Sequence, residues 1–241
     1  MKEITELDIL AIGAHRDDCD IMAGGTIIKM NDMGYKVGIL DLTQGEMGTR
    51  GNAEIREKEA FCSACCMGVV HRENLSLPDT RVEVTFENRI KMIEVIRRLK
   101  PKVILAPYWD QKHPDHVHTA ELVKEAVFYS GLKKYDVGEG PHRPRKILYY
   151  LPFSYGITPS FFMDISEQFE RKLAAIKCFY SQFVDIQADL HLTPYLDGIL
   201  EKVEYYNGYF GRAVKVKYAE GFVSTEPILL DSIMDMKVHT F

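Results

Sequence analysis

Two short polar segments of the chain contain side chains that bind divalent metals. The first reads His15-Arg16-Asp17-Asp18, and the second reads His113-Pro114-Asp115-His116. Together they supply three imidazoles and three carboxylates. A catalytic zinc ion takes three protein ligands from these residue types and keeps a fourth position for water. The two segments therefore indicate a metal-dependent reaction.

The spacing within the segments suggests which of these residues bind the metal and which take part in the reaction. His15 and Asp18 are three residues apart on a tight turn and can bind one ion, and His116 completes the set. Asp17 and His113 are then left beside the metal, where a general base and a group that stabilises an oxyanion belong.

Helix capping is the alternative explanation for the same residues. Asp17 and Asp18 could cap a helix that begins near Ile21, and His113 and Asp115 could cap the next one. Either segment alone fits both explanations about equally well. The occurrence of both segments directly after strand-like runs favours the metal site.

The strands that must position these segments are short and apolar. Residues 7–13 form an apolar run that is broken once by Asp8, and residues 103–106 form another before Pro107. In open α/β sheets the ligand crevice lies at the carboxyl ends of the strands. Two loops that are distant in sequence can therefore meet at this edge of the sheet.

Strand-like and helix-like runs alternate along the chain, as βαβ units require. We expect further strands at residues 35–42, 74–77, 146–151 and 160–163, and a late hairpin or strand pair at 222–230. We expect helices at residues 21–33, 52–67, 85–99, 117–129, 167–179 and 194–206. The fold class predicted is α/β, a Rossmann-like single domain over residues 1–241 with a mainly parallel sheet flanked by helices.

Composition excludes several classes of protein. The 241 residues are 46% hydrophobic and 27% charged, which is typical of a soluble globular chain. Thirty basic and thirty-five acidic residues give a net charge of −5, which argues against a general nucleic-acid or anionic-membrane binder. No apolar run reaches the length of a membrane span, and residues 1–6 are charged, so we expect neither a transmembrane helix nor a signal peptide. We expect a cytoplasmic protein with no nucleic-acid or membrane partner.

The five cysteines do not form a disulfide framework, because three of them are crowded together. Cys62, Cys65 and Cys66 resemble half of a zinc site, but no second group of Cys or His lies near them in sequence. At helical spacing they form one apolar stripe, for which core packing is the favoured interpretation. Cys19 is expected to be a small buried hydrophobe.

The two polar segments resemble the motifs of the PIG-L/LmbE-like zinc-dependent N-acetylglucosamine deacetylases. That family has Ala-His-Pro-Asp-Asp after the first strand and a later His-Pro-Asp-His, and this chain has Ala14-His15-Arg16-Asp17-Asp18 and an identical second motif. The later blocks are most similar to the branch that deacetylates N-acetylglucosaminyl malate in bacillithiol synthesis. The matching blocks cover residues 24–26, 41–43, 45–46, 48–51, 56–59, 106–109, 172–176, 180–183 and 218–222.

The resemblance implies a role for each residue of the two motifs. His15, Asp18 and His116 would hold Zn²⁺, and Asp17 would be the base that activates water. His113 would be protonated beside the developing oxyanion. Asp115 would fix the orientation of His113.

Two arginines next to the Gly-rich loop are candidates for substrate binding. Arg56 matches a family arginine that faces the substrate. Arg50 and Arg56 together could recognise an anionic group, since arginine binds carboxylates in a bidentate manner. A surface salt bridge is the alternative for each of them.

Two positions depart from the family pattern. Arg16 replaces the proline that follows the first histidine, so a rigid turn is lost and a positive charge is gained near the metal. Asp20 replaces a glutamate with a shorter carboxylate. Neither change removes a ligand, although Arg16 could reduce metal affinity or activity.

The resemblance implies a hydrolase that releases acetate and a free amine from a small-molecule amino-sugar substrate, with Asp17 or His113 protonating the leaving amine. Alternatives are another N-acetylglucosaminide, of the chitobiose or inositol-linked type, and a non-catalytic metal- or sugar-binding descendant. Similar proteins are often hexamers, so we expect a homo-oligomer. Four aromatic residues could form its contacts if they are exposed, and could equally belong to the core: Tyr205, Tyr206, Tyr209 and Phe210.

Overall fold

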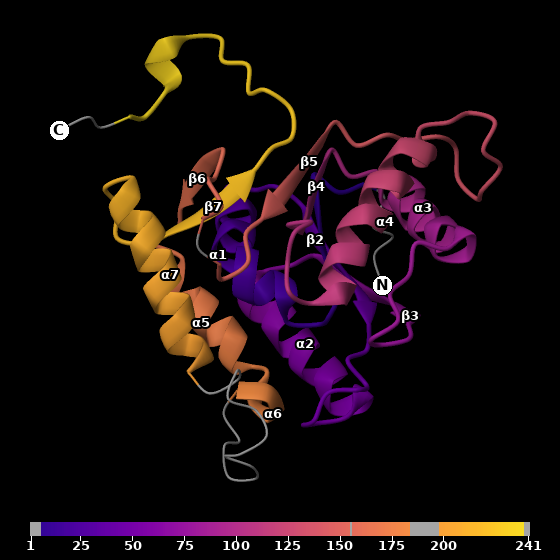
Figure 1. Cartoon of the computed structure of the whole chain (residues 1–241), viewed down its shortest axis with the longest axis horizontal. Helices are drawn as coiled ribbons and strands as arrows, with labels where there is room; N and C mark the ends of the chain where they lie inside the picture. Colours follow the sequence, from indigo (N-terminus) through magenta and orange to yellow (C-terminus); the bar gives the residue numbers. More distant parts are fainter. Residues whose placement is uncertain (1–5, 155, 184–197, 239–241) are drawn as a thin grey trace.

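The computed structural model describes residues 6–154, 156–183 and 198–238, and these residues form one seven-stranded sheet between helices (Figure 1). The strand order is β3-β2-β1-β4-β5-β7-β6. The five strands from β3 to β5 are parallel, whereas β7 is antiparallel to both β5 and β6. The strands are β1 (Ile9–Gly13), β2 (Val37–Thr43), β3 (His71–Leu77), β4 (Val103–Pro107), β5 (Lys146–Tyr150), β6 (Phe161–Asp164) and β7 (Ala219–Val223). The predicted fold class is confirmed.

The central strands are buried along their whole length and mostly apolar, because helices cover both faces of the sheet. Every residue of β1 and β2 is buried. Ile9 of β1 pairs with Val37 of β2 on one side and with Val103 of β4 on the other. The carboxyl ends of β1, β2 and β4 therefore lie at the same edge, and the segment after each strand begins there.

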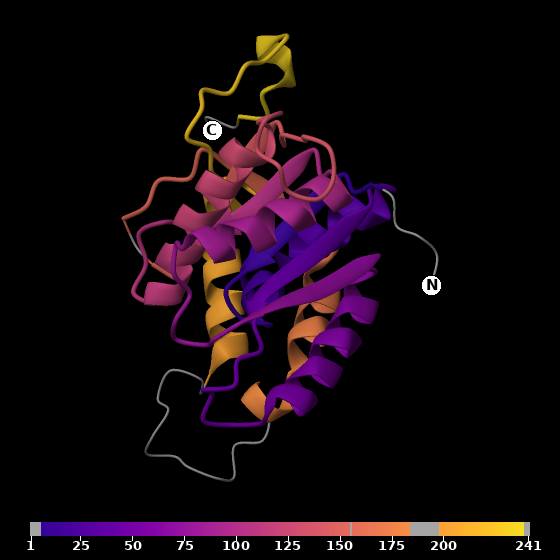
Figure 2. The ribbon, with the colours of Figure 1, turned by 90° about the vertical axis from the view of Figure 1, so that its right-hand side faces the viewer.

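The helices form two layers, one on each face of the sheet (Figure 2). Helices α3 and α4 pack together on one face, and α1, α2 and α5 pack together on the other. Helix α7 lies against β7. The helices are α1 (Asp18–Asp32), α2 (Ala53–Met67), α3 (Phe86–Leu99), α4 (Pro114–Ser130), α5 (Phe169–Lys177), α6 (Tyr180–Phe183) and α7 (Ile199–Ala213).

Several predicted boundaries need correction. Helix α1 begins at Asp18 and α4 begins at Pro114, each three residues before the expected start. Acidic side chains stabilise the first turn of a helix, so Asp18 and Asp115 belong to the first turns of α1 and α4, while residues 15–17 and His113 precede these helices. The predicted helix 167–179 corresponds to α5, which is shorter at both ends, and the short helix α6 follows it; β3 is longer than expected. Helix α7 extends to Ala213, well beyond the predicted end, while residues 194–197 lie outside the described part.

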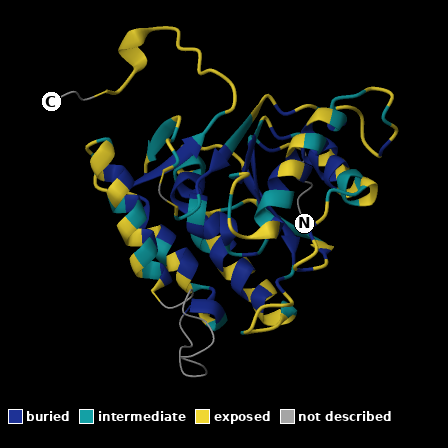
Figure 3. Ribbon diagram, viewed as in Figure 1, coloured by how far each residue is buried: buried dark blue, intermediate teal, exposed yellow. Residues whose placement is uncertain are grey.

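The predicted hairpin at 222–230 is wrong. Strand β7 ends at Val223, and residues 224–238 then leave the body of the molecule, with one turn of 3-10 helix at Ile233–Asp235 (Figure 1). Both sheet positions beside β7 are already filled by β5 and β6, so no edge is free for a further strand there. Large apolar side chains of this tail are exposed (Figure 3): Ile228, Leu229, Leu230, Ile233, Met234, Met236 and Val238.

None of the described helices is long and apolar enough to cross a membrane.

Candidate metal centre

The turn between β1 and α1 positions the first polar segment. Gly13 ends β1, and a Cβ atom there would lie 2.9 Å from the carbonyl oxygen of His15 and 3.1 Å from the Cβ of Asp18. A larger residue would push the turn open. The backbone N–H of His15 donates to Asp18 Oδ2 at 2.9 Å and closes the turn. The Asp17 side chain does not cap α1, so capping does not explain this residue.

The second segment lies at the start of α4, which follows β4, the neighbour of β1 in the sheet. His113 is the N-cap residue, and its Nδ1 accepts a hydrogen bond from the backbone N–H of Asp115 at 3.2 Å. Pro114 suits the first turn because it lacks the N–H that would have no partner there. Helix capping thus accounts for part of the role of His113. His116, in the first turn of α4, lies close to His15 of the first segment.

Three residues of the two segments place their ligand atoms at the corners of a small triangle, with both carboxylate oxygens of Asp18 at one corner. His116 Nε2 lies 3.2 Å from Asp18 Oδ1 and 3.3 Å from His15 Nδ1, and His15 Nδ1 lies 3.5 Å from Asp18 Oδ2. Ligands bound to zinc at roughly 2.0–2.1 Å with tetrahedral angles are about 3.3 Å apart. The structure therefore brings His15, Asp18 and His116 together at the spacing of one zinc ion.

The outer nitrogens of both imidazoles face hydrogen-bond acceptors. His15 Nε2 lies 3.2 Å from Asp79 Oδ1 and 3.6 Å from Asp115 Oδ2, and His116 Nδ1 lies 2.9 Å from Gln111 Oε1. An acceptor on the outer nitrogen fixes the proton there and leaves a lone pair on the inner one. Two lone pairs and a carboxylate thus converge on one point, which is the donor set of a cation site.

The electrostatics of the centre favour a cation at that point. Burial alone would lower the pKa of His15, but Asp18, Asp115 and Asp79 together raise it well above its usual value. Burial would raise the pKa of Asp18, but His116 and His15 hold it well below its usual value. Burial is likewise outweighed at Asp79, where contacts with His15 and with the backbone of Met47 lower the pKa to about 2.

Asp17 is paired with Arg56 rather than with the helix. Arg56 Nη2 lies 3.7 Å from Asp17 Oδ2, and Arg56 Nη1 donates to the carbonyl oxygen of Gly45 at 2.7 Å. Gly45 has a φ of +71°, and a Cβ atom there would collide with the guanidinium of Arg56. Arg56 is buried, so it anchors the Gly-rich loop and holds Asp17.

Comparison with known proteins identifies the family. The family model described as GlcNAc-PI de-N-acetylase, PIG-L, matches residues 10–127. Diacetylchitobiose deacetylase of Thermococcus kodakarensis is 36% identical over 228 residues, which cover 88% of this chain and 81% of that protein. The chain belongs to the PIG-L family.

Solved structures of similar proteins have the same fold. The conserved protein TT1542 from Thermus thermophilus matches with a TM-score of 0.85 and 35% identity, over 94% of this chain and 98% of the other. N,N'-diacetylchitobiose deacetylase from Pyrococcus horikoshii matches with a TM-score of 0.77 and 31% identity, over 92% and 85%. The resemblance noted in the two motifs is thereby confirmed at the level of the family.

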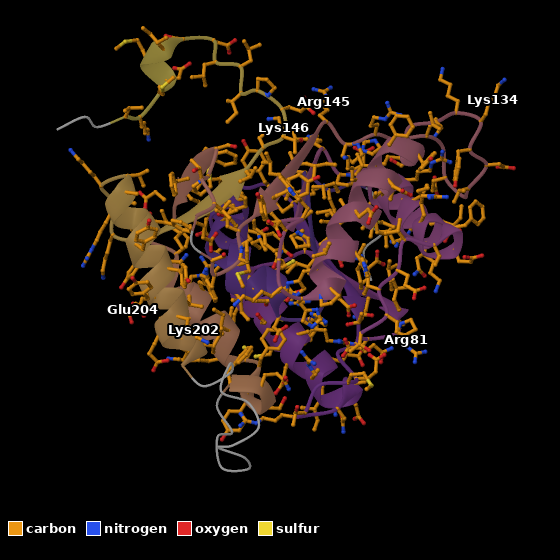
Figure 4. The ribbon with its side chains drawn as sticks, in the orientation of Figure 1. Arg81, Lys134, Arg145, Lys146, Lys202 and Glu204 are labelled. Atoms are coloured by element: carbon orange, nitrogen blue, oxygen red, sulfur yellow. The ribbon has the colours of Figure 1, made fainter. Side chains whose placement is uncertain are left out.

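In this PIG-L chain, a wide cleft opens beside the metal triangle. It has a volume of about 1220 Å³, and His113 and His116 lie in its wall. Aromatic side chains line it, among them Tyr108 and the stacked rings of Phe153 and Tyr206, whose centroids are 4.9 Å apart. Lys202 of α7, labelled in Figure 4, lines the side that α7 contributes.

Two roles that the resemblance implies for the second motif do not match the contacts. His113 Nδ1 accepts a hydrogen bond, and burial together with His15 and His116 lowers the pKa of His113, so the ring is neutral with its proton on Nε2. The Asp115 carboxylate accepts from the N–H groups of Thr80 and Val82 and faces His15. Asp115 therefore orients His15, and only its backbone N–H contacts His113.

Neither candidate arginine lines the cleft. Arg56 is buried beneath the Gly-rich loop, and Arg50 contributes its carbonyl oxygen to a hydrogen bond from Gln182 at 2.6 Å. The cleft-lining cations are Lys112 and Lys202 instead. The expectation that Arg56 faces the substrate does not match this arrangement.

Both departures from the family pattern lie at a buried arginine, Arg72 of β3. Arg72 donates to Asp41 at 2.9 Å and to Asp20 at 3.1 Å, and it also donates to the backbone carbonyl of Arg16. Ser63 of α2 donates to the same Asp20 carboxylate. Asp20 is thus a buried partner of Arg72, and the Arg16 side chain is buried rather than exposed at the metal.

Three residues at the centre were not found from the sequence: Asp79, Gln111 and Arg72. Asp79 follows the carboxyl end of β3, so the strand-end rule that identified His15 would also have pointed to it. Gln111 precedes the second motif on the same loop. Arg72 gives no such signal, because a charged residue in a polar strand looks exposed.

The cysteines only partly follow the prediction. Cys19 is fully buried in the core, as expected. Core packing is wrong for Cys62 and Cys65, which are exposed, while Cys66 packs partly against the core.

Proposed function

We propose that this protein is a zinc-dependent hydrolase that removes the N-acetyl group from an N-acetylglucosamine conjugate. The observation that carries the proposal is the triangle of His15 Nδ1, Asp18 and His116 Nε2, with sides of 3.2 to 3.5 Å, at the wall of a large cleft. Membership of a family that contains named deacetylases supports the reaction class.

His15, Asp18 and His116 would hold the zinc ion, and Asp79, Asp115 and Gln111 would fix the two imidazoles around it. A zinc ion in such a site polarises a carbonyl group and lowers the pKa of water to about 7. The converging lone pairs fit an ion that prefers imidazole and carboxylate ligands.

The remaining residues supply proton transfer and charge stabilisation. The Asp17 carboxylate, held by Arg56, accepts a proton as the water oxygen forms a bond to the acetyl carbon. The neutral His113 donates its Nε2–H to the oxyanion of the tetrahedral intermediate. Cleavage of the C–N bond then requires protonation of the amine, which Asp17 supplies by returning the proton that it accepted, because a neutral His113 has no acidic proton to give. Acetate and a glucosamine amine are the products.

The cleft supports a substrate larger than one sugar. Its volume of about 1220 Å³ exceeds the roughly 300–1,000 Å³ typical of small-molecule sites. Lys112 and Lys202 lie in its wall, and lysine ammonium groups attract carboxylates. N-acetylglucosaminyl malate, the substrate of the bacillithiol pathway, has an N-acetyl sugar and two carboxylates and is our proposed substrate.

Diacetylchitobiose is the second candidate substrate. The identity of 36% to the Thermococcus kodakarensis diacetylchitobiose deacetylase favours it. Aromatic rings in the cleft, such as Phe153 and Tyr206, provide apolar faces on which a second sugar ring can pack.

Acetate release from the zinc-loaded protein tests the reaction and the substrate together. We expect turnover of N-acetylglucosaminyl malate to exceed that of diacetylchitobiose and of an inositol-linked N-acetylglucosaminide. Replacing both Lys112 and Lys202 with alanine should raise KM for the malate conjugate and leave KM for diacetylchitobiose nearly unchanged. Equal effects on the two substrates would argue for the chitobiose assignment.

The variant Asp17→Ala tests the proposed base. It should retain zinc by elemental analysis and lose at least about 100-fold in kcat, the usual contribution of a general base. Zinc-loaded wild-type protein with no turnover of any N-acetylglucosaminide would favour the alternative of a non-catalytic binding protein.

We also propose a cytoplasmic, single-domain homo-oligomer, with a hexamer as the expected size. Exposed Tyr205 and Tyr209 on α7 support a subunit contact, whereas Phe210 is buried and does not. Light scattering of the purified chain measures the size directly.

A further inference from the structure

Three cysteine thiols that are distant in sequence converge on the surface between α2 and α5. Cys62 and Cys66 are one helical turn apart on α2, and Cys178 follows the last turn of α5. Their sulfur atoms all lie within 4.8 Å of one another. Cys178 Sγ is 2.6 Å from Cys62 Sγ and 3.7 Å from Cys66 Sγ.

This arrangement differs from ordinary packing of thiols as small hydrophobes. Buried cysteines pack singly among apolar side chains, as Cys19 does in this protein. Here Cys62 is exposed, and Cys66 and Cys178 are half-buried. Cys65, on the same helix, is also exposed but is not part of the group. The three thiols thus face one another at a point that solvent can reach.

The spacing suits a thiophilic metal ion. Sulfur ligands bound to zinc at about 2.3 Å with tetrahedral angles are about 3.8 Å apart. The 3.7 Å between Cys66 and Cys178 already matches this value. The 2.6 Å between Cys62 and Cys178 is shorter than this value, so the sulfur of the exposed Cys62 would have to move away from Cys178 as the ion binds. Thiolate is the ligand that selects zinc and cuprous copper over harder ions.

We propose that Cys62, Cys66 and Cys178 form a second metal site, which binds a thiophilic d¹⁰ cation, zinc or cuprous copper. Each thiol loses its proton to solvent as its sulfur binds the ion, and no electron is transferred. The fourth position of a zinc ion would face solvent. The site shares no ligand with the His15, Asp18 and His116 centre and does not depend on the proposed function.

The thiols release their protons when they bind the ion, so the affinity of the site for the ion should increase as the pH rises.

An ion at this position would join two elements that contact the Gly-rich loop. Glu59 of α2 accepts hydrogen bonds from the backbone N–H and the hydroxyl of Ser181, three residues after Cys178. Gln182 then donates to the carbonyl oxygen of Arg50 in that loop. The metal would thus crosslink α2 to the α5–α6 segment beside an existing hydrogen-bonded contact.

Cadmium titration of the intact metal-free protein tests the proposal, with a phosphine reductant that carries no thiol. Sulfur-bound cadmium has an ultraviolet charge-transfer band, which histidine- and carboxylate-bound cadmium lacks. We expect two bound ions, one of which produces the band. Cys178→Ser should abolish the band and weaken that site at least 100-fold, since even loss of an outer-shell partner costs about 10–100-fold. Competition with Zn²⁺ and with Cu⁺ identifies the natural ion by displacement of cadmium.

Two control variants and one substitute variant complete the test. Cys65→Ser, on the same exposed helix, should keep the band, and His116→Ala should lose one ion without losing the band. Cys66→Ser repeats the test if Cys178→Ser does not fold. A band that survives the loss of Cys62 or Cys178, or cadmium that neither competing ion displaces, would overturn the proposal. A Cys62–Cys178 disulfide found by peptide mass mapping of protein kept in reductant would also overturn it.

Discussion

Replacing Arg72 with methionine should destabilise the fold strongly, because this buried guanidinium neutralises two buried carboxylates. Arg72 donates to Asp41 at 2.9 and 3.1 Å and to Asp20 at 3.1 and 3.2 Å. It also donates to the carbonyl oxygen of Ala60 and lies over the ring of Phe179. Methionine fills a similar volume but leaves all of these acceptors without their donor.

The size of the effect follows from the burial of the carboxylates. Burial raises the pKa of Asp41 from 3.8 to about 6 even with Arg72 in place, and it also raises the pKa of Asp20. Moving one pKa from 3.8 to about 6 corresponds to about 3 kcal/mol of cost for the charged form. Removing one partner of a buried ion pair typically costs about 3–5 kcal/mol. We expect a loss in this range for Arg72→Met at neutral pH.

The loss should become smaller in acid. A carboxyl whose folded pKa is raised favours folding in its protonated form, so its contribution is fully present below the unfolded value of 3.8 and is lost as the pH rises through about 6. Without Arg72 the pKa of both carboxyls rises further. Lowering the pH to about 5 therefore protonates them in the folded variant and recovers part of the lost stability.

Urea unfolding at about pH 7.5 and about pH 5 measures both effects. Arg171→Met is the matched control, because Arg171 pairs with Asp32 at 2.7 Å while both side chains are exposed. Exposed pairs contribute about 0–1 kcal/mol. The reasoning is refuted if Arg72→Met costs no more than Arg171→Met, or if its deficit grows in acid.

Three further predictions concern the site, and one concerns the tail. Asp79→Asn should weaken zinc binding by about 10–100-fold in a competition titration, because it loosens the orientation of His15; unchanged affinity would contradict that role. His15 has a raised pKa, so its protonated form stabilises the metal-free fold below pH 6.5, and this contribution is lost as the pH rises through the raised value. Zinc displaces that proton, so the affinity of the protein for zinc, measured by calorimetry, should rise with pH. A zinc affinity that does not change with pH would contradict this prediction. Arg56→Lys should lower kcat more than it raises KM, because Arg56 contacts Asp17 and not the cleft; a change in KM alone would assign it to substrate binding. Truncation after Val223 should leave the free energy of unfolding unchanged within about 0.5 kcal/mol, since the apolar side chains of the tail are exposed; a larger loss would show that the tail packs on the body.

The sequence predicted the metal triangle because one rule connects it to the fold. Parallel strands carry their following residues to one edge of the sheet, and β1 and β4 are neighbours. His15 and His116 could therefore be brought together without knowing any side-chain contact. The roles of Asp115 and Arg56 were harder to predict, because they depend on which neighbour each side chain reaches across a few ångströms.

Features that depend on distant parts of the chain were not predictable from local pattern. Cys178 completes the thiol group of α2, but no spacing rule links it to Cys62. Residues 222–230 have the apolar content of a strand, but β5 and β6 already occupy both positions beside β7, where the second strand of a hairpin would pair. A strand needs a free edge as well as a suitable sequence, and only the assembled sheet shows where the edges are.

The cleft is built from two successive parts of the chain, and this division bears on how such a protein can diverge. Residues 10–127, which match the family model, carry all three metal ligands. The opposite wall comes largely from later residues, such as Phe153 and Tyr206. Mutations in the later part can reshape what the cleft accepts while the bond-breaking groups remain in place. The proposed metal ligands thus lie in one stretch of the gene, whereas residues of both stretches, Lys112 among them, shape the cleft.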